Sequence, residues 1–278
     1  MSKLSVAAVN YLNTKPFLYG IFNSGITDKL DLKLAIPSEC ARMLEENEVD
    51  FGLVPAAALA EMDEYYLISD FCIGSTGGVQ TVGIFSEVPI NQIEKLYLDF
   101  HSRTSVELAK VLIKDYWNIN PVLETSFPGF EKTAIKGTTA GLVIGDKAIE
   151  IRNQYPFFYD FGKAWRDKEG LPFVFAVWVS KKPLSDEFVD AFNQALQKGI
   201  DLVPQLLYIL PSPTVDFSLE RYFTENISYD LDTAKMKGLQ RFLSYLGDKR
   251  PLRIHSGELV VVSISKKRRY APLLQLEY

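Results

Sequence analysis

The sequence predicts an α/β protein with two lobes, and three observations support this. Residues 4–55 alternate short apolar strands with amphipathic helices, and a second block of the same kind begins near residue 95. A long apolar run at 171–180 then predicts a central strand that returns the chain to the first block. Such alternation is typical of parallel sheets covered by helices. A chain of 278 residues with 47% hydrophobic residues is long enough for this plan.

Three short strands are predicted in the first block: 4–9, 31–36 and 51–55. Asn13 or Thr14 is suited to cap the helix after the first strand, with Pro16 in its first turn. Ser38 is the expected N-cap of the helix after the second strand. The first block is therefore βαβαβ.

The glycine-rich stretch CIGSTGGVQTVGIFS, 72–86, predicts a loop followed by a strand. It contains neither GxxxxGKS/T nor GxGxxG, so a turn is favoured over a phosphate-binding loop. In the second block, 95–100 is a strand, and Thr104 with Glu107 has the spacing of a capping box at the start of a helix. Ser185 is the expected cap of a long amphipathic helix beyond residue 180.

The predicted lobes divide the chain at two places. Lobe 1 comprises 1–86 and 176–278 and is discontinuous, whereas lobe 2 comprises 87–175. A two-lobed α/β protein binds its ligand in the cleft at the carboxyl ends of the strands. Within the tail, 251–278, GELVVVSIS is a strand candidate and KKRR at 266–269 is interpreted as a solvated charge run rather than a docking patch.

Composition excludes several classes of function. The net charge of −5 gives no basic footprint for nucleic acid or an anionic membrane. No signal sequence or membrane span is predicted, so we expect a cytoplasmic protein. Cys40 and Cys72 are expected to be buried free thiols. His101 and His255 lie far apart without metal-ligand spacing, so no metal site is predicted.

Polar side chains gather where predicted strands end. The first strand is followed by Tyr11, Asn13, Thr14 and Lys15, and the strand at 95–100 is followed by HSRTS, 101–105. Helix N-termini present unpaired N–H groups and favour anions. Ser38 stands at a third such terminus. These groups predict a site for a small acidic ligand.

Individual roles stay open at this level. Arg103 offers a planar fork for a carboxylate, with Ser102, Thr104 and Ser105 around it; the alternative is that the hydroxyls cap a helix and Arg103 is a surface charge. His101 is either a general base or a structural residue, and the latter is favoured. Asp146 is suited equally to binding a hydroxyl or capping a helix. Trp165 and Trp178 are expected in the core or the cleft wall.

Several segments of the sequence together resemble the chorismate dehydratase family of the futalosine route to menaquinone. They are VNYLNTKPFLYG (9–20), IPSECARML (36–44), VDFGLVPAA (49–57), DFHSRTSVELAKVLI (99–113), GLVIGDKA (141–148) and GLPFVFAVW (170–178). The combination of YLNTKP and SRTS is specific to the family. The resemblance covers about residues 4 to 250 and does not extend over 251–278.

The resemblance implies a type II periplasmic-binding-protein fold and removal of water from chorismate without a metal or an organic cofactor. It implies Asn13 as the leading catalytic residue. The other residues expected to bind the substrate are Tyr11, Thr14, Ser38, Ser102, Arg103, Thr104, Ser105 and Asp146. The proton acceptor is either the enolpyruvyl carboxylate of the substrate or, as a weaker option, His101.

Two other functions compete with this one. A cytoplasmic protein that binds a small carboxylate without catalysis would use the same fold. The sister enzyme, 1,4-dihydroxy-6-naphthoate synthase, also shares it, but the pair of motifs favours the dehydratase. The sequence does not give the oligomeric state.

Overall fold

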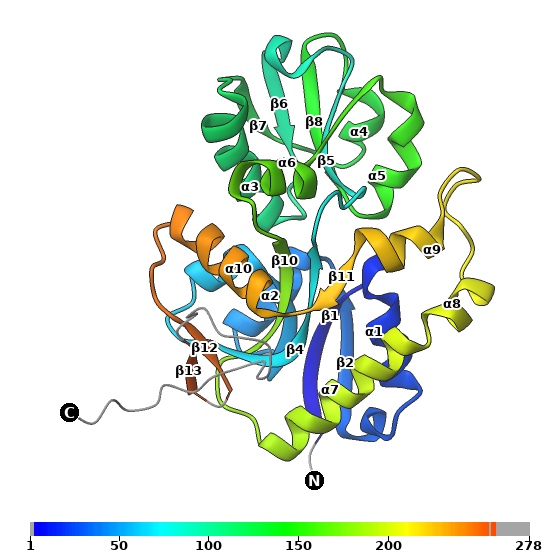
Figure 1. The fold of residues 1–278 in the computed structure, drawn as a ribbon, viewed down its shortest axis with the longest axis vertical. Coiled ribbons are helices and arrows are strands. Elements are labelled where there is room, and N and C mark those ends of the chain that lie inside the picture. The colour runs from blue at the N-terminus through cyan, green and yellow to red at the C-terminus, as the bar shows by residue number, and fades with distance from the viewer. Residues whose placement is uncertain (1–2, 256, 260–278) are drawn as a thin grey trace.

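Two sheets form the frame of the protein, each at the centre of one lobe (Figure 1). The computed structural model describes residues 3–255 and 257–259. The first sheet runs in the order β13-β12-β4-β10-β3-β1-β2, with β11 paired to β4. Its strands are β1 (Leu4–Val9), β2 (Leu30–Ala35), β3 (Phe51–Pro55), β4 (Tyr66–Ser75), β10 (Phe173–Ser180), β11 (Ser228–Asp230), β12 (Leu252–Ile254) and β13 (Gly257–Leu259).

The second sheet runs in the order β7-β6-β8-β5-β9 and defines lobe 2. Its strands are β5 (Val82–Ser86), β6 (Lys95–Leu98), β7 (Val122–Thr125), β8 (Thr139–Ile144) and β9 (Phe157–Asp160). By sheet membership the chain changes lobes within 76–81 and again within 161–172. β5, which was expected in lobe 1, therefore belongs to the sheet of lobe 2. The first three residues of β10, 173–175, were expected in lobe 2 and belong to the sheet of lobe 1.

Helices cover both sheets. Those of lobe 1 are α1 (Lys15–Phe22), α2 (Pro37–Glu45), α7 (Asp186–Asp201), α8 (Val203–Ile209), α9 (Leu219–Arg221) and α10 (Thr233–Tyr245). Those of lobe 2 and the second crossing are α3 (Arg103–Leu112), α4 (Phe130–Thr133), α5 (Asp146–Ile151) and α6 (Phe161–Glu169). Short 3-10 turns are η1 (Leu12–Thr14), η2 (Gly25–Lys29), η3 (Ala56–Ala60), η4 (Ile90–Gln92) and η6 (Arg152–Gln154), and π-helical turns are η5 (Ile113–Trp117) and η7 (Tyr222–Asn226).

Parallel pairing brings the ends of several strands to one place. β1 is parallel to β2 and β3, and β6 is parallel to β7 and β8. Since parallel strands end at the same edge of a sheet, the residues that follow β1 and β3 face those that follow β6 and β8 across the cleft.

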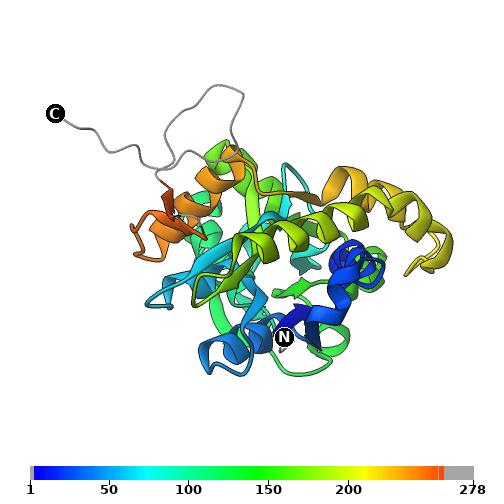
Figure 2. The same cartoon turned by 90° about the horizontal axis from the view of Figure 1, so that it is seen from below.

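Close packing fixes α1, which follows the end of β1. Gly20 of α1 and Gly199 of α7 lie where the two helices touch, and a Cβ atom on Gly199 would stand only 1.9 Å from the Pro16 carbonyl oxygen. Any larger side chain here would push the helices apart. Figure 2 shows α1 and α7 side by side, with α8 and α9 extending beyond them.

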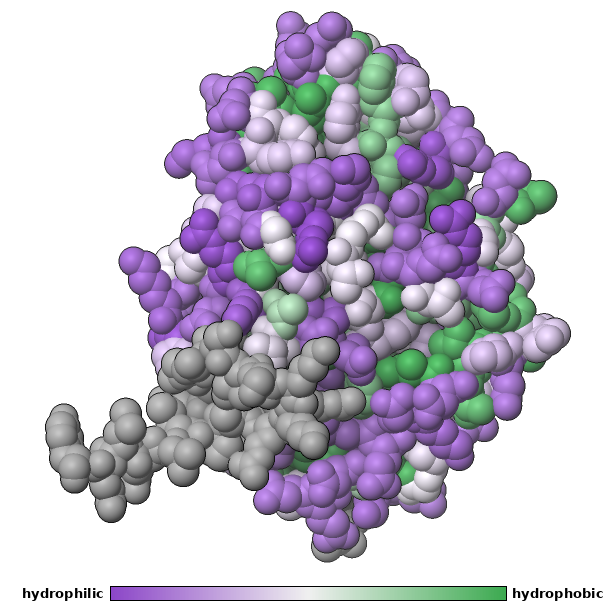
Figure 3. Space-filling view, in the orientation of Figure 1, coloured by the Kyte–Doolittle hydropathy of each residue, from purple (hydrophilic) through white to green (hydrophobic). Residues whose placement is uncertain are grey.

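The core confirms the expectations for the buried residues. Trp165 and Trp178 are 0% and 1% exposed, and Cys40 and Cys72 are buried free thiols. The face drawn in Figure 3 is mostly hydrophilic. No helix in the described part of the chain has the length and apolar character needed to cross a membrane.

Some local expectations were wrong. The first four residues of the glycine-rich stretch, 72–75, belong to β4, which pairs with β10 and β11, whereas its predicted strand VGIFS is present as β5. The helix α2 has Ile36 rather than Ser38 at its N-cap position. The tail residues 266–269 and most of the predicted strand GELVVVSIS lie outside the described residues; its first three residues form β13.

Candidate functional site

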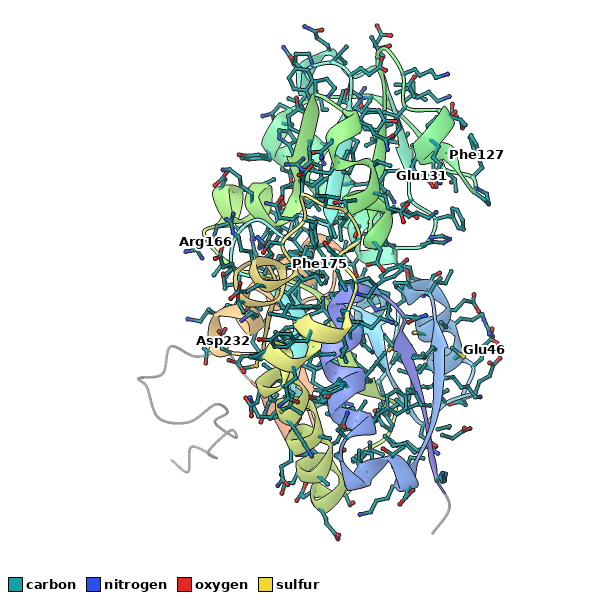
Figure 4. The ribbon with its side chains drawn as sticks, turned by 90° about the vertical axis from the view of Figure 1, so that its right-hand side faces the viewer. Glu46, Phe127, Glu131, Arg166, Phe175 and Asp232 are labelled. Atoms are coloured by element: carbon teal, nitrogen blue, oxygen red, sulfur yellow. The ribbon has the colours of Figure 1, made fainter. Side chains whose placement is uncertain are left out.

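A narrow cavity lies between the lobes, at the strand ends that the fold brings together. Its volume is about 60 Å³. Its walls come from both lobes and are Val9, Tyr11, Asn13, Thr14, Pro37, Leu53, Pro55, Ile73, Val79, Val82, Ser102, Thr104, Ser105, Ile144, Gly145, Phe175 and Ala176. In Figure 4, Phe175 lies at the waist between the lobes. None of these lining residues carries a formal charge, so the cavity is an apolar slot with a few amides and hydroxyls.

Asn13 and Thr14 form the polar side of this cavity in lobe 1. The 3-10 turn η1 follows β1 and places both residues just before α1. The Thr14 hydroxyl donates to Asn13 Oδ1 at 3.1 Å rather than capping α1, and Thr14 is completely buried. This bond engages the amide oxygen of Asn13, and no described residue accepts a hydrogen bond from its Nδ2.

Tyr229 supports the same turn from behind. Its hydroxyl donates to the main-chain oxygen of Asn13 at 3.0 Å. Tyr229 is buried, and its ring packs edge-on against Phe17 with 5.1 Å between the centroids. Asn13 is therefore held through both its side chain and its main chain. Tyr229 stands 216 positions away in the sequence, and no motif links the two residues.

Lobe 2 contributes the N-terminus of α3 to the opposite side. Ser102 is the N-cap, and its Oγ accepts from the Ser105 N–H at 3.1 Å. The Ser102 hydroxyl also donates to Ser105 Oγ at 2.8 Å. Both serines are buried and line the cavity. The N-terminal end of a ten-residue helix carries a partial positive charge, which suits a carboxylate.

Thr104 joins the lobes rather than forming the expected capping box with Glu107. Its hydroxyl donates to the Phe175 carbonyl oxygen at 3.1 Å and accepts from the Ala57 N–H at 3.1 Å. Thr104 is buried, and both of its partners belong to lobe 1: Ala57 lies in η3 and Phe175 in β10. The contacts that fix Thr104 are tertiary, which is why the local spacing misplaced the cap.

Arg103 points to carboxylates of lobe 1 and does not line the cavity. Its Nη1 lies 2.6 Å from Glu45 Oε1 and 2.9 Å from Glu61 Oε2. Glu45 ends α2, and Glu61 follows η3. The guanidinium therefore forms an ion-pair bridge between the two lobes.

Asp146 forms a second bridge between the lobes. Its Oδ1 accepts from the Leu12 N–H at 3.0 Å, so the start of α5 is tied to η1. Burial raises the pKa of the Asp146 carboxyl, and the bond from Leu12 opposes that shift. Asp146 is not among the lining residues, but the turn η1 that it bonds to contains the lining residues Asn13 and Thr14.

Tyr11 lines the cavity next to this bridge. A Cβ atom on Gly145 would stand 3.2 Å from the Tyr11 ring, and Gly145 has a positive φ of 66°. The positive φ favours glycine, and the Tyr11 ring leaves little room for a Cβ atom. Burial, together with Asp99 and Asp146, raises the pKa of the Tyr11 hydroxyl well above its usual value, so this group acts as a neutral hydrogen-bonding partner.

Asp99 and His101 lie at the end of β6, outside the set of lining residues. The His101 N–H donates to Asp99 Oδ1 at 2.9 Å, and His101 Nδ1 is 3.6 Å from the same oxygen. Burial raises the pKa of Asp99, while His101 opposes the shift. The His101 ring packs against Phe100. This geometry matches the structural interpretation of His101.

Two further candidates lie away from the cavity. Ser38 is half-buried in the first turn of α2, and only its neighbour Pro37 lines the cavity. Lys15 donates to Asn10 Oδ1 at 2.8 Å on an exposed surface. Within the described ranges, no group of three or more His, Cys, Asp or Glu side chains is arranged to hold a metal ion.

Solved structures similar to this one share the periplasmic-binding-protein architecture. A protein of Archaeoglobus fulgidus aligns with a TM-score of 0.67 at 15% identity, covering 88% of this chain and 97% of its own. A Candida albicans protein described as having the generic periplasmic binding protein fold aligns with a TM-score of 0.62 at 13% identity, covering 89% of this chain and 90% of its own. The predicted fold is confirmed.

Curated relatives carry a more specific description. A chorismate dehydratase of Thermus thermophilus is 27% identical over 234 residues, which cover 77% of this chain and 85% of that protein. A chorismate dehydratase of Campylobacter jejuni is 24% identical over 246 residues, covering 84% and 94%. The profile of the family described as "Menaquinone biosynthesis" matches residues 4–248. This match spans both lobes and every residue of the cavity, and the chain belongs to the menaquinone biosynthesis family.

Proposed function

We propose that this protein is a chorismate dehydratase, a hydro-lyase that converts chorismate into 3-[(1-carboxyvinyl)oxy]benzoate and water. The observation that supports the proposal is that Asn13 of the YLNTKP motif and the SRTS helix terminus line one and the same cavity between the lobes. The two curated relatives are described as having the same activity.

The reaction suits a site without charged side chains. The C3–H bond of chorismate breaks first, and its electron pair delocalises through the ring alkene towards the C1 carboxylate. The C4 hydroxyl then leaves, and with the proton it becomes water. No oxidation state changes between protein and substrate, and formation of the benzene ring drives the step. The enzyme has mainly to orient the substrate and stabilise the negative charge that develops.

Asn13 is proposed to stabilise that charge. Since Thr14 engages its Oδ1, the Nδ2 group has its hydrogens free to donate to an oxygen of the substrate. An amide held by Thr14 and Tyr229 is pre-organised, which gives a hydrogen bond its greatest effect on a transition state.

The N-terminus of α3 is proposed to bind a substrate carboxylate. Ser102 and Ser105 contribute hydroxyls, and the helix end contributes unpaired N–H groups. Arg103 is proposed to act at a distance by holding the cleft shut, because its guanidinium is engaged by Glu45 and Glu61. Tyr11, Thr14 and Thr104 shape the remaining walls.

The enolpyruvyl carboxylate of the substrate is proposed as the proton acceptor. His101 contacts Asp99 outside the cavity, and no carboxylate in the described part of the chain lines it. A base carried by the substrate itself is positioned as soon as the substrate is bound.

The test is to incubate the purified protein with chorismate and record the ultraviolet spectrum. The expected result is a new aromatic absorbance, with the product lighter than chorismate by one water in mass spectrometry. Chorismate that binds but is recovered unchanged would show a non-catalytic binding protein instead.

A further inference from the structure

A second cavity lies on lobe 2 beside the first crossing between the lobes. Its volume is about 350 Å³, within the range of roughly 300–1,000 Å³ found for small-molecule sites. The residues that line it are Gln80, Tyr116, Trp117, Arg152, Phe158, Tyr159, Asp160, Lys163, Ala164 and Asp167. It shares no lining residue with the cleft cavity.

The walls of this hinge cavity are largely aromatic. Trp117 lies 5.8 Å from Tyr116 and 6.0 Å from Tyr159 between ring centroids. Phe158 contributes a further ring, and Arg152 stacks its guanidinium 3.9 Å above that ring's centroid. Such walls suit a flat, apolar ligand body.

The acidic groups of the hinge cavity already have partners. Asp160 accepts from the main-chain N–H groups of Val79, Gln80 and Lys163 at 3.0, 2.7 and 3.0 Å. Asp167 pairs with Lys163 Nζ at 2.6 Å. These carboxylates are satisfied by the protein itself.

Arg152 differs from them. Among the described residues, none accepts a hydrogen bond from its guanidinium or forms an ion pair with it, and none forms a hydrogen bond with the side-chain amide of Gln80, whose main-chain N–H is the group that donates to Asp160. Burial lowers the pKa of Arg152, and the charge of Asp160 only opposes this. A guanidinium offers a planar fork for a carboxylate and a face that stacks on rings.

We propose that the hinge cavity is a second ligand site, which takes a small aromatic carboxylate with its carboxylate on Arg152 and its ring against Trp117 and Tyr159. The site lies beside the first crossing between the lobes, so a ligand bound there is placed to regulate the cleft. Gln80 lines the hinge cavity, whereas its neighbour Val79 lines the cleft cavity, and Asp160 holds the N–H groups of both. Gln80 also has a strained positive φ of 67°, a feature that concentrates at ligand clamps and switches.

Benzoate is the probe that tests the proposal, because it is the simplest aromatic carboxylate. Titration calorimetry of the full chain is expected to show binding that Arg152→Gln weakens by about tenfold or more, the value of one charged hydrogen-bond pair. Arg152→Lys keeps the charge without the fork and is expected to lie in between. Benzyl alcohol, which lacks the charge, is expected to bind at least about tenfold more weakly than benzoate.

Arg166→Gln is the matched control. Arg166 lies on α6 outside both cavities, and Figure 4 shows it at the outer side of the molecule. This variant is expected to bind benzoate as the parent does, and equal melting temperatures verify that all variants fold. Benzoate that binds Arg152→Gln and Arg166→Gln equally well, or that fails to bind the parent protein at millimolar concentration, would overturn the proposal. Neither outcome depends on chorismate turnover.

Discussion

At the scale of single residues, Asn13 owes its position to the groups that hold it. The Thr14 hydroxyl engages its side-chain oxygen, and Tyr229 engages its main-chain oxygen. A neutral amide does not accept a proton at ordinary pH, so its contribution to an elimination is hydrogen-bond donation. That role predicts a specific kinetic signature.

Replacing Asn13 with alanine is expected to lower kcat by about 10²-fold or more, the usual cost of removing one pre-organised donor. Chorismate binding, measured by calorimetry, is expected to change little, because α3 still binds the carboxylate. Asn10→Ala is the control, since the Asn10 side chain bonds only to half-buried Lys15 among the described residues and does not line the cavity. Turnover by Asn13→Ala at the parent rate would remove this residue from the mechanism.

At the scale of elements, the start of α3 shows what local sequence patterns predict and what they do not. The sequence predicts a helix here and places it correctly, but it assigns the cap to Thr104 instead of Ser102. The Thr104 hydroxyl is used by Ala57 and Phe175, which are 47 and 71 positions away. Local spacing contains no information about such partners, whereas Ser185, whose role is purely local, caps α7 as predicted.

The serine caps of α3 and α7 allow stability to be separated from function. Ser102 accepts from Ser105 N at 3.1 Å, and Ser185 accepts from Phe188 N at 3.3 Å. Replacing either serine with alanine is expected to cost about 1 kcal/mol in the free energy of unfolding. Only Ser102→Ala is expected to raise the KM for chorismate, because only Ser102 lines the cavity. Equal kinetics for the two variants would contradict a binding role for Ser102.

The contact between α6 and α10 predicts a dependence of stability on pH. Burial by itself raises the pKa of Glu169, but Arg241, Lys168 and Tyr245 outweigh it and lower that pKa to about 2. A lowered folded-state pKa stabilises the protein above the usual carboxyl range near 4.5, and this stabilisation is lost as the pH falls towards 2.

Replacing Glu169 with glutamine is therefore expected to destabilise the protein by about 1.5 kcal/mol or more at pH 7. The difference from the parent protein is expected to shrink as the pH is lowered to about 3. Denaturant unfolding at the two pH values measures it. Glu225→Gln, which breaks an exposed pair with Arg221, is expected to have little effect at either pH. A loss of stability independent of pH would show that Glu169 acts through packing alone.

At the scale of the whole molecule, the sequence predicts the two lobes and the cleft from the alternation of strands and helices. It also places Asn13 and the serines of SRTS at strand ends that border this cleft. It does not predict the roles of Arg103 and Asp146, whose partners lie in the other lobe at Glu45, Glu61 and Leu12. Contacts between the ends of helices in different lobes have no periodicity in the sequence, so these partners become visible only once both lobes are placed.

These contacts describe a closed cleft. A cavity of about 60 Å³ is far smaller than the roughly 300 Å³ or more of ordinary ligand sites, so chorismate has to enter with the lobes further apart. The ion pairs of Arg103 and the bond from Leu12 to Asp146 oppose that opening. Because the side chains of Arg103 and Glu45 are 30% and 32% exposed, water screens their attraction and the latch is weak.

Replacing Arg103 with glutamine is expected to shift the lobes towards the open state. A partly exposed pair contributes about 1 kcal/mol or less, so the affinity for chorismate is expected to fall by about fivefold at most. Small-angle X-ray scattering of the ligand-free protein is expected to show a larger radius of gyration, and added salt is expected to move the parent towards the variant. Arg42→Gln is the control, because Arg42 pairs with Glu39, Glu46 and Glu48 within lobe 1. An affinity loss of about a hundredfold, corresponding to nearly 3 kcal/mol, would instead mean that Arg103 contacts the substrate directly, since a surface latch is too weak to account for it.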